Sequence, residues 1–133
     1  MESCKSSIIY LASKFLHSNI SLHSDLDPNF LYVGSREGYK NFSLALNIFE
    51  LILTKESNAK LVVCGAAPNK NEKMETNKFR KSLEWVVFPN DDELSIIYQN
   101  SFALLYTTSY EGFGLPLLEA MSNGCIPVAR NHS

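Results

Sequence analysis

The chain has 133 residues, of which 45% are hydrophobic, and this is enough for one domain of ordinary size with a buried core. Charged residues make up 20% of the chain and the formal net charge is −2, so the composition excludes the basic surface that nucleic-acid-binding proteins use. The apolar stretches are short and interrupted by polar residues, which excludes a membrane-spanning helix of about 20 apolar residues.

The N-terminal residues and the cysteines indicate a cytoplasmic protein. The start of the chain lacks the long apolar core and small-residue cleavage site of a signal peptide. Cys4, Cys64 and Cys125 are odd in number and far apart, which favours reduced thiols. We expect Cys64 and Cys125 in or near the core, and a redox pair is the less favoured alternative.

A polar stretch around Pro28 divides the chain into two parts. Residues 1–28 are predicted to form a linker or helical segment that stays outside the sheet. A short helix over residues 7–16 would have an apolar face made of Ile8, Leu11, Ala12 and Phe15. Residues 29–133 carry a regular pattern of strands and helices and are predicted to form the folded domain.

Five short apolar runs in the second part predict β-strands. These strands are expected over residues 30–33, 61–64, 85–88, 102–106 and 126–129. Helices are expected over residues 42–54, about 91–100 and 114–123. The apolar face of the first helix is expected at Leu44, Ile48, Leu51 and Ile52. Residues 68–76 are polar and predict a surface loop, after which a short helix can form over 75–82.

Apolar strands without alternation, each followed by a helix, predict an α/β fold. We expect a parallel sheet of about five strands with helices on both faces. Ligands of such sheets bind outside the carboxyl ends of the strands. The loops expected to carry a site are therefore residues 34–41, 65–73, 89–92 and 107–115. The turn at Gly124 lies at the opposite edge and is expected to be structural.

The segment GSREGYKN follows the first expected strand and leads into a helix. Its glycines, of which Gly34 is the first, allow a tight turn and a close approach of the backbone to a ligand. Arg36 and Lys40 place two cations where a diphosphate could be bound through charge-assisted hydrogen bonds. Asn41 is expected to cap the following helix. The alternative interpretation is a solvated turn with a surface Arg and Lys; a P-loop is excluded because Gly-Lys-Ser/Thr is absent.

The segment SYEGFGLPLLEAM follows the fourth expected strand at the same edge. Gly112 and Gly114 flank Phe113 and allow the backbone amides to face a ligand, and the helix that follows offers its free N–H groups to an anion. Glu111 lies in the loop and Glu119 about one turn inside the helix, so the two carboxylates can hold different parts of an elongated ligand. A merely structural role at the positive end of a helix explains Glu111 well but not Glu119.

The sequence EGFGLPLLEAM resembles the Glu-x7-Glu motif of the retaining GT-B glycosyltransferases, most closely glycosyltransferase family 4, the glycosyl transferases group 1. YVGSREGYKN, LVVCG and ALLYTTSYEGFG are similar to further segments of that family, in the same order and spacing. The resemblance covers residues 30–129. It implies that residues 29–133 are part of the Rossmann-like C-terminal half of a GT-B fold, which binds the nucleotide sugar.

The resemblance also implies roles for individual residues. Lys40 matches the lysine that contacts the donor diphosphate, Glu119 the glutamate that binds the ribose, and Glu111 the glutamate that holds the transferred sugar. The amides that would meet the phosphates and the sugar are those of Phe113, Gly114 and Leu115. The family often has an arginine directly after the first-strand glycine, where this chain has Ser35. Either Arg36 takes that role or the loop is one residue shorter.

The implied reaction is transfer of a sugar, with retention, from a nucleoside diphosphate to a hydroxyl of a saccharide, a lipid or another acceptor. Lys40, Arg36 and the helix N-terminus would stabilise the charge of the leaving diphosphate. No metal or other cofactor is therefore expected, and His17, His23 and His132 lack the spacing of metal ligands. The resemblance also allows peripheral association of the full-length enzyme with a membrane.

The N-terminal GT-B domain, which the resemblance assigns to the acceptor, is not represented in the sequence, so we expect a partial enzyme. Two alternatives stay open: a truncated, inactive nucleotide-sugar-binding module and a GT-B sugar-nucleotide epimerase. A glycoside hydrolase is less favoured, because a Glu-Gly-Phe-Gly loop that leads into a helix fits phosphate binding better.

Overall fold

The computed structural model describes residues 28–110 and 114–130. In this part, five parallel strands form one sheet in the order β3-β2-β1-β4-β5. The strands are β1 (Asn29–Val33), β2 (Lys60–Gly65), β3 (Leu83–Val87), β4 (Ala103–Tyr106) and β5 (Ile126–Ala129). The helices are η1 (Gly38–Lys40), α2 (Phe42–Leu53), α3 (Lys70–Glu75), η2 (Thr76–Phe79), α4 (Asp91–Gln99) and α5 (Leu115–Ser122). The predicted α/β fold is thereby confirmed.

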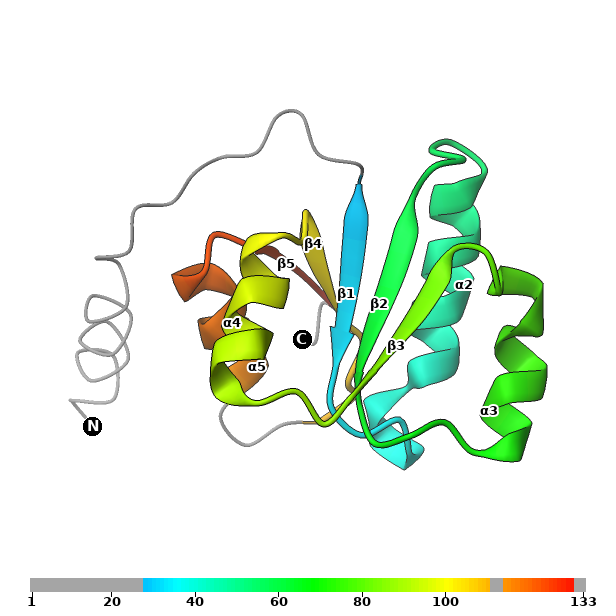
Figure 1. Cartoon of the computed structure of the whole chain (residues 1–133), viewed down its shortest axis with the longest axis horizontal. Helices are drawn as coiled ribbons and strands as arrows, with labels where there is room; N and C mark the ends of the chain where they lie inside the picture. Colours follow the sequence, from blue (N-terminus) through cyan, green and yellow to red (C-terminus); the bar gives the residue numbers. More distant parts are fainter. Residues whose placement is uncertain (1–27, 111–113, 131–133) are drawn as a thin grey trace, which may run out of the picture.

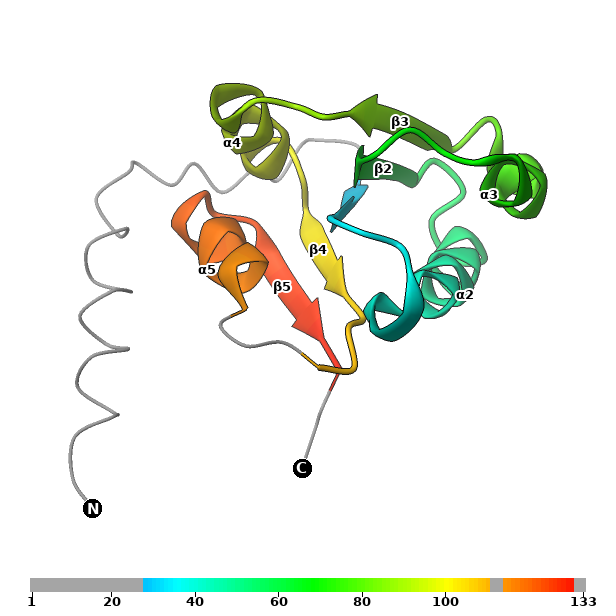
Figure 2. The ribbon, with the colours of Figure 1, turned by 90° about the horizontal axis from the view of Figure 1, so that it is seen from below.

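The sheet is covered on both faces, as predicted. Helices α2 and α3 lie on one face, and α4 and α5 lie on the other (Figures 1 and 2). One cluster of buried side chains joins β1, β2 and β4 to α2, and a second joins the other face to α4 and α5. The chain runs outward from β1 to β3 and then returns to the other side of β1 for β4 and β5. The strand order therefore reverses between β1 and β4.

Helix α2 buries a stripe that only partly matches the predicted one, since Ile48 and Ile52 pack against the core but are half-buried. The buried positions are Phe42, Ala45, Leu46 and Phe49. Leu51, which was expected on the apolar face, is 69% exposed. Both stripes have helical spacing, and the aromatic side chains decide between them, because Phe42 packs edge-on against Tyr32 and Phe49 against Phe79.

The predicted loop over residues 68–76 is wrong, because most of it forms helix α3. The Asn69 side chain accepts a hydrogen bond from the Glu72 amide at 2.9 Å, and the Glu72 carboxylate accepts one from the Asn69 amide at 2.8 Å. This capping box begins a helix that has no buried side chain, so apolar spacing could not reveal it. The short helix expected over 75–82 is instead the 3-10 turn η2 (Thr76–Phe79).

Strand β3 ends one residue earlier than predicted. Phe88 leaves the strand with a left-handed φ of 47°, and its side chain is 75% exposed. Its amide still donates a hydrogen bond to the Gly65 carbonyl at 2.9 Å. The chain therefore turns away from the sheet at an aromatic residue, before Pro89.

Cys64 and Cys125 are buried free thiols, as predicted. Burial raises the pKa of Cys64 to about 11 and that of Cys125 to about 12. Residues 1–27, with Cys4 and the helix expected over 7–16, lie outside the described residues, so the linker stays a prediction. No helix in the described part of the chain has the length and apolar character needed to cross a membrane.

Candidate functional site

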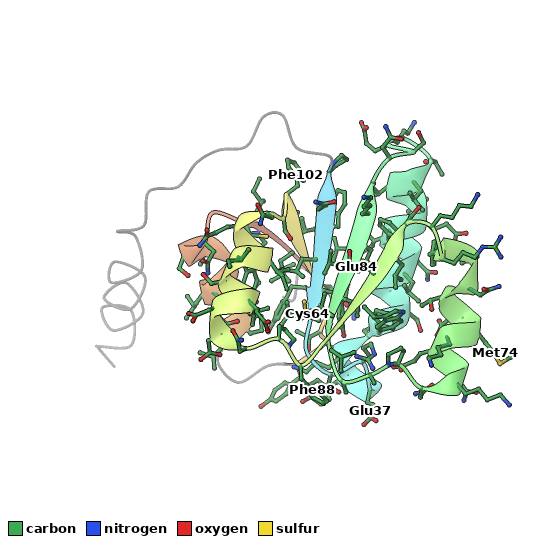
Figure 3. The ribbon with its side chains drawn as sticks, in the orientation of Figure 1. Glu37, Cys64, Met74, Glu84, Phe88 and Phe102 are labelled. Atoms are coloured by element: carbon green, nitrogen blue, oxygen red, sulfur yellow. The ribbon has the colours of Figure 1, made fainter. Side chains whose placement is uncertain are left out.

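The loops that follow β1, β2, β3 and β4 all lie at the carboxyl edge of the sheet. Figure 3 shows Glu37 and Phe88 at this edge and Phe102 at the opposite one. Parallel sheets bind ligands at the point where the strand order reverses, which here lies between the ends of β1 and β4. The two motifs singled out in the sequence are the loops that follow these two strands.

The ends of β1 and β2 approach each other closely at two glycines. Gly34 has a φ of 115°, and its amide donates a hydrogen bond to the Cys64 carbonyl at 3.0 Å. Gly65 has a φ of 152°, and a Cβ on it would lie 2.7 Å from the Gly34 oxygen. A side chain at Gly65 would push the two strand ends apart, so the loop geometry depends on this contact.

Arg36 points toward α3 and is paired there with Glu72. Its Nε donates to Glu72 Oε1 at 2.7 Å, and its Nη2 donates to Glu72 Oε2 and to the Ala67 carbonyl, both at 3.2 Å. The guanidinium carbon lies 5.1 Å from the centre of the Trp85 ring. The side chain is only 5% exposed, and within the described residues its Nη1 is buried without a hydrogen-bond partner.

The position of Arg36 differs from the open ligand edge expected from the sequence. The ion pair lowers the pKa of Glu72, mainly through the hydrogen bonds from Arg36. To meet a diphosphate, Arg36 would have to use its Nη1, which is unpaired among the described residues, or exchange this carboxylate for the ligand. Its predicted catalytic role therefore stays a prediction, and it has a competing structural partner.

Lys40 ends the 3-10 turn η1, and its Nζ lies 5.2 Å from the centre of the Tyr39 ring. Asn41 follows with a left-handed φ of 51°. It takes the N-cap position of α2, as predicted, but within the described chain its side chain makes no capping hydrogen bond. The sharp turn at Asn41 instead directs the carbonyls of this segment toward the end of β4.

Three consecutive residues after β4 donate hydrogen bonds to these carbonyls. The Thr107 hydroxyl lies 3.1 Å from the Lys40 carbonyl and 2.9 Å from that of Asn41. The Thr108 hydroxyl and the Ser109 amide donate to the Tyr39 carbonyl at 3.3 and 2.7 Å. The loops that carry Lys40 and Glu111 are thus joined by hydrogen bonds.

Gly114, whose φ is 61°, is the N-cap of helix α5. A Cβ there would lie 3.3 Å from a Leu117 methyl and 3.7 Å from the Tyr106 hydroxyl. That hydroxyl is buried and has no hydrogen-bond partner among the described residues. Leu115 is the first residue of the helix and is 60% exposed. Glu111, Gly112 and Phe113 lie outside the described residues, so their roles stay predictions.

Glu119 lies inside α5, as predicted, and its side chain is exposed. The Tyr98 hydroxyl, from α4, donates a hydrogen bond to Glu119 Oε2 at 3.0 Å. Tyr98 is only 1% exposed, and burial followed by the negative charge of Glu119 raises its pKa. Glu119 Oε1 has no hydrogen-bond partner within residues 28–110 and 114–130, so one carboxylate oxygen is held and the other can accept from a ligand.

The family model described as "Glycosyl transferases group 1" matches residues 13–133. The chain belongs to this family. It is 33% identical over 98 residues to the serotype-specific mannosyltransferase WbdA of Escherichia coli, a match that covers 70% of this chain and 12% of the relative. It is 27% identical over 128 residues to the poly(glycerol-phosphate) alpha-glucosyltransferase of Bacillus subtilis, covering 84% of this chain and 18% of that protein.

The fold of the chain is that of a known domain of the glycosyl transferases group 1. The crystal structure of the C-terminal domain of the group 1 glycosyl transferase LpcC from Francisella tularensis superimposes with a TM-score of 0.65 and 21% identity. The match covers 78% of this chain and 58% of that one. The chain thus has the fold of a C-terminal domain of this family, and it spans less than a fifth of the length of the two curated relatives.

Within this group 1 domain, sequence reasoning missed two sets of residues. Tyr98 contacts Glu119 across 21 positions, and Thr107 contacts Lys40 across 67. A tyrosine on an amphipathic helix and a threonine after a strand are common, so neither pattern indicates a partner. The only sequence feature that pointed to the Thr107 contact is the pair of hydroxyl side chains, Thr107 and Thr108, that directly follows a buried strand at the edge where ligands bind.

Proposed function

We propose that this chain is the donor-binding part of a retaining glycosyltransferase and holds a nucleoside-diphosphate sugar for transfer to an acceptor hydroxyl. The observation that carries the proposal is the position of Glu119. It lies on the helix that begins at the reversal of strand order, with one carboxylate oxygen fixed by Tyr98 and the other available. A carboxylate held in this way suits the vicinal hydroxyls of a ribose.

The diphosphate would lie between Lys40 and the start of α5. The amides of Gly114 and Leu115, and of Phe113 before them, would donate to phosphate oxygens at the positive end of the helix. Lys40 would add a full positive charge, which matters most when the diphosphate leaves and gains charge. Arg36 would join them through its Nη1, which has no partner in the described part of the chain, or through the whole guanidinium after leaving Glu72. Glu111 would hold hydroxyls of the transferred sugar.

The names of the relatives favour a hexose as the transferred group, since one is a mannosyltransferase and the other an alpha-glucosyltransferase. The acceptor site would come from an N-terminal GT-B domain, because the relatives are several times longer than the matched region. A hydroxyl of a saccharide or of a lipid-linked or polymeric compound would be the acceptor. Independence of metal ions, a cytoplasmic location and peripheral membrane association stay predictions.

Calorimetric titration with UDP, GDP, UDP-glucose, GDP-mannose and pyrophosphate tests the proposal. We expect the chain to bind at least one nucleotide, and Glu119→Ala to weaken that binding by about 10- to 100-fold, as expected for lost hydrogen bonds to a charged group. Binding of pyrophosphate should change much less, because it has no ribose. Glu50→Ala, which removes an exposed glutamate from α2, is the control and should bind like the wild type. Equal losses for nucleotide and pyrophosphate would exclude the ribose assignment.

A further inference from the structure

We propose that Thr107 is a positioning residue of the donor site, which fixes the turn that carries Lys40 against the strand end that leads to Glu111. The expected effect of this residue on nucleotide binding rests on the proposed function, but the contact between the two loops exists without any ligand. Both loops lie at the point where the strand order reverses.

The carbonyls of Tyr39, Lys40 and Asn41 are consecutive and all point toward the segment after β4. The Asn41 carbonyl also accepts a hydrogen bond from the Leu44 amide at 3.1 Å, whereas the carbonyls of Tyr39 and Lys40 lie at the end of a helical turn and need donors from elsewhere. Here the donors are the hydroxyls of Thr107 and Thr108 and the amide of Ser109, at 2.7 to 3.3 Å. All three acceptors are therefore satisfied by one short segment.

Thr107 is the central donor of this contact. Its single hydroxyl proton is shared between the carbonyls of Lys40 and Asn41, at 3.1 and 2.9 Å. The only other donor that reaches the Lys40 carbonyl within the described residues is the Tyr32 hydroxyl, at 3.5 Å, and that hydroxyl is 2.8 Å from the Ser35 carbonyl. Thr107 is 4% exposed, so water cannot replace its hydroxyl.

The contact sets where the Lys40 side chain starts. Asn41 has a left-handed backbone, which asparagine adopts more readily than most non-glycine residues, and Thr107 is bonded to its carbonyl. Without the Thr107 hydroxyl, the turn can rotate and Lys40 moves relative to the start of α5. A ligand whose diphosphate contacts both then binds more weakly, whereas a nucleoside without phosphates is unaffected.

The test compares Thr107→Val with a closely matched control, Thr76→Val. Thr76 is also 4% exposed, and its hydroxyl also donates to a backbone carbonyl, that of Glu72 at 2.7 Å. Thr76 lies at the end of α3, away from the reversal of strand order. Both variants should melt at a lower temperature than the wild type. Only Thr107→Val should lower the affinity for UDP or GDP, by about fivefold or more, because the displaced Lys40 loses a charge-assisted contact.

Three further measurements sharpen the result. The affinity for uridine or guanosine should be equal in the wild type and Thr107→Val, and Thr107→Ser, which keeps the hydroxyl, should restore nucleotide affinity. Should Thr107→Val fail to fold, Thr107→Ala replaces it, because it also removes the hydroxyl but places no branched side chain in the buried position. Unchanged UDP and GDP affinity in the folded variant, or an equal loss in Thr76→Val, overturns the positioning role alone. A wild type that binds neither nucleotide overturns the proposed function as well.

Discussion

Two glutamates near the carboxyl edge of the sheet are each held by a buried side chain, but in different ways. Glu72, at the start of α3, has both oxygens occupied, by Arg36 and by the Asn69 amide, and its side chain is 15% exposed. Glu119, on α5, is exposed and is held through one oxygen by Tyr98. Within the described residues, the first carboxylate already accepts three hydrogen bonds, and the second accepts one.

The difference shows that residue type and position at the edge do not by themselves identify a binding group. A carboxylate can accept about four hydrogen bonds, and the number already used inside the protein decides whether it stabilises the fold or binds a ligand. Arg36 and Glu72 bond to each other, so most of their hydrogen-bonding capacity on the α3 side of the edge is already used. The α5 side keeps an acceptor at Glu119 and free amides at the helix start.

The largest effect is expected from Arg36→Met, which leaves Glu72 largely buried and unpaired. Breaking a buried ion pair from one side lowers the free energy of unfolding by about 3 kcal/mol, which urea denaturation measures. Lys78→Met is the matched control, because Lys78 also pairs with a glutamate, Glu50, and lies 4.9 Å from the ring centre of Phe79, but on the surface. It should lower stability by about 0.5 kcal/mol or less. An Arg36→Met variant that keeps its stability and loses nucleotide binding would instead make Arg36 a ligand contact.

The same pair predicts how stability depends on pH. The pKa of Glu72 is lowered in the folded state from an ordinary value of 4.5, so the pair contributes fully above that pH. Its contribution is lost as the pH falls through the lowered pKa of the folded state. Glu72→Gln should therefore flatten the decline of stability below pH 4.5, measured by denaturation at several pH values. Arg36→Met should flatten it too, and a wild-type slope in both variants would contradict the assignment.

The smallest effect is expected from Tyr98→Phe, which removes only the hydroxyl that holds Glu119. Nucleotide affinity should fall about fivefold, as for the loss of one hydrogen bond that orients a charged group. In the Glu119→Ala background the same change should not lower affinity further, because the two residues act together. Calorimetric titration of the four proteins measures this. Independent, additive losses would mean that Tyr98 does not act through Glu119.

The fold could be predicted from the sequence because its three central strands, β1, β2 and β4, are largely buried. Short apolar runs such as residues 61–64 indicate such strands without any knowledge of their neighbours. Helix α3 was missed because it buries no side chain and depends on the Asn69–Glu72 capping box. The fully buried positions of α2 were not predicted, because aromatic packing of Phe42 and Phe49, rather than spacing, selects the buried face.

The candidate site was predictable in its location but not in its contacts. The loops of Lys40 and Glu119 could be placed at one edge because parallel strands end there. The partner of Arg36 depends on Glu72, 36 positions away, and that of Glu119 on Tyr98, 21 positions away. Such contacts follow from the packing of α3 and α4 on the sheet, which no local pattern specifies.

The reactivity of the two buried thiols reports on local unfolding of this protein. Cys64 and Cys125 pack in the same cluster as Tyr98, beneath α4 and α5. Only the thiolate reacts with alkylating reagents, so burial and raised pKa values protect both sulfurs while these helices stay on the sheet. The rate of alkylation at neutral pH therefore measures how often the layer that carries Glu119 separates from the sheet. Mass spectrometry of the two cysteine peptides measures the alkylation of each thiol separately, without any introduced label.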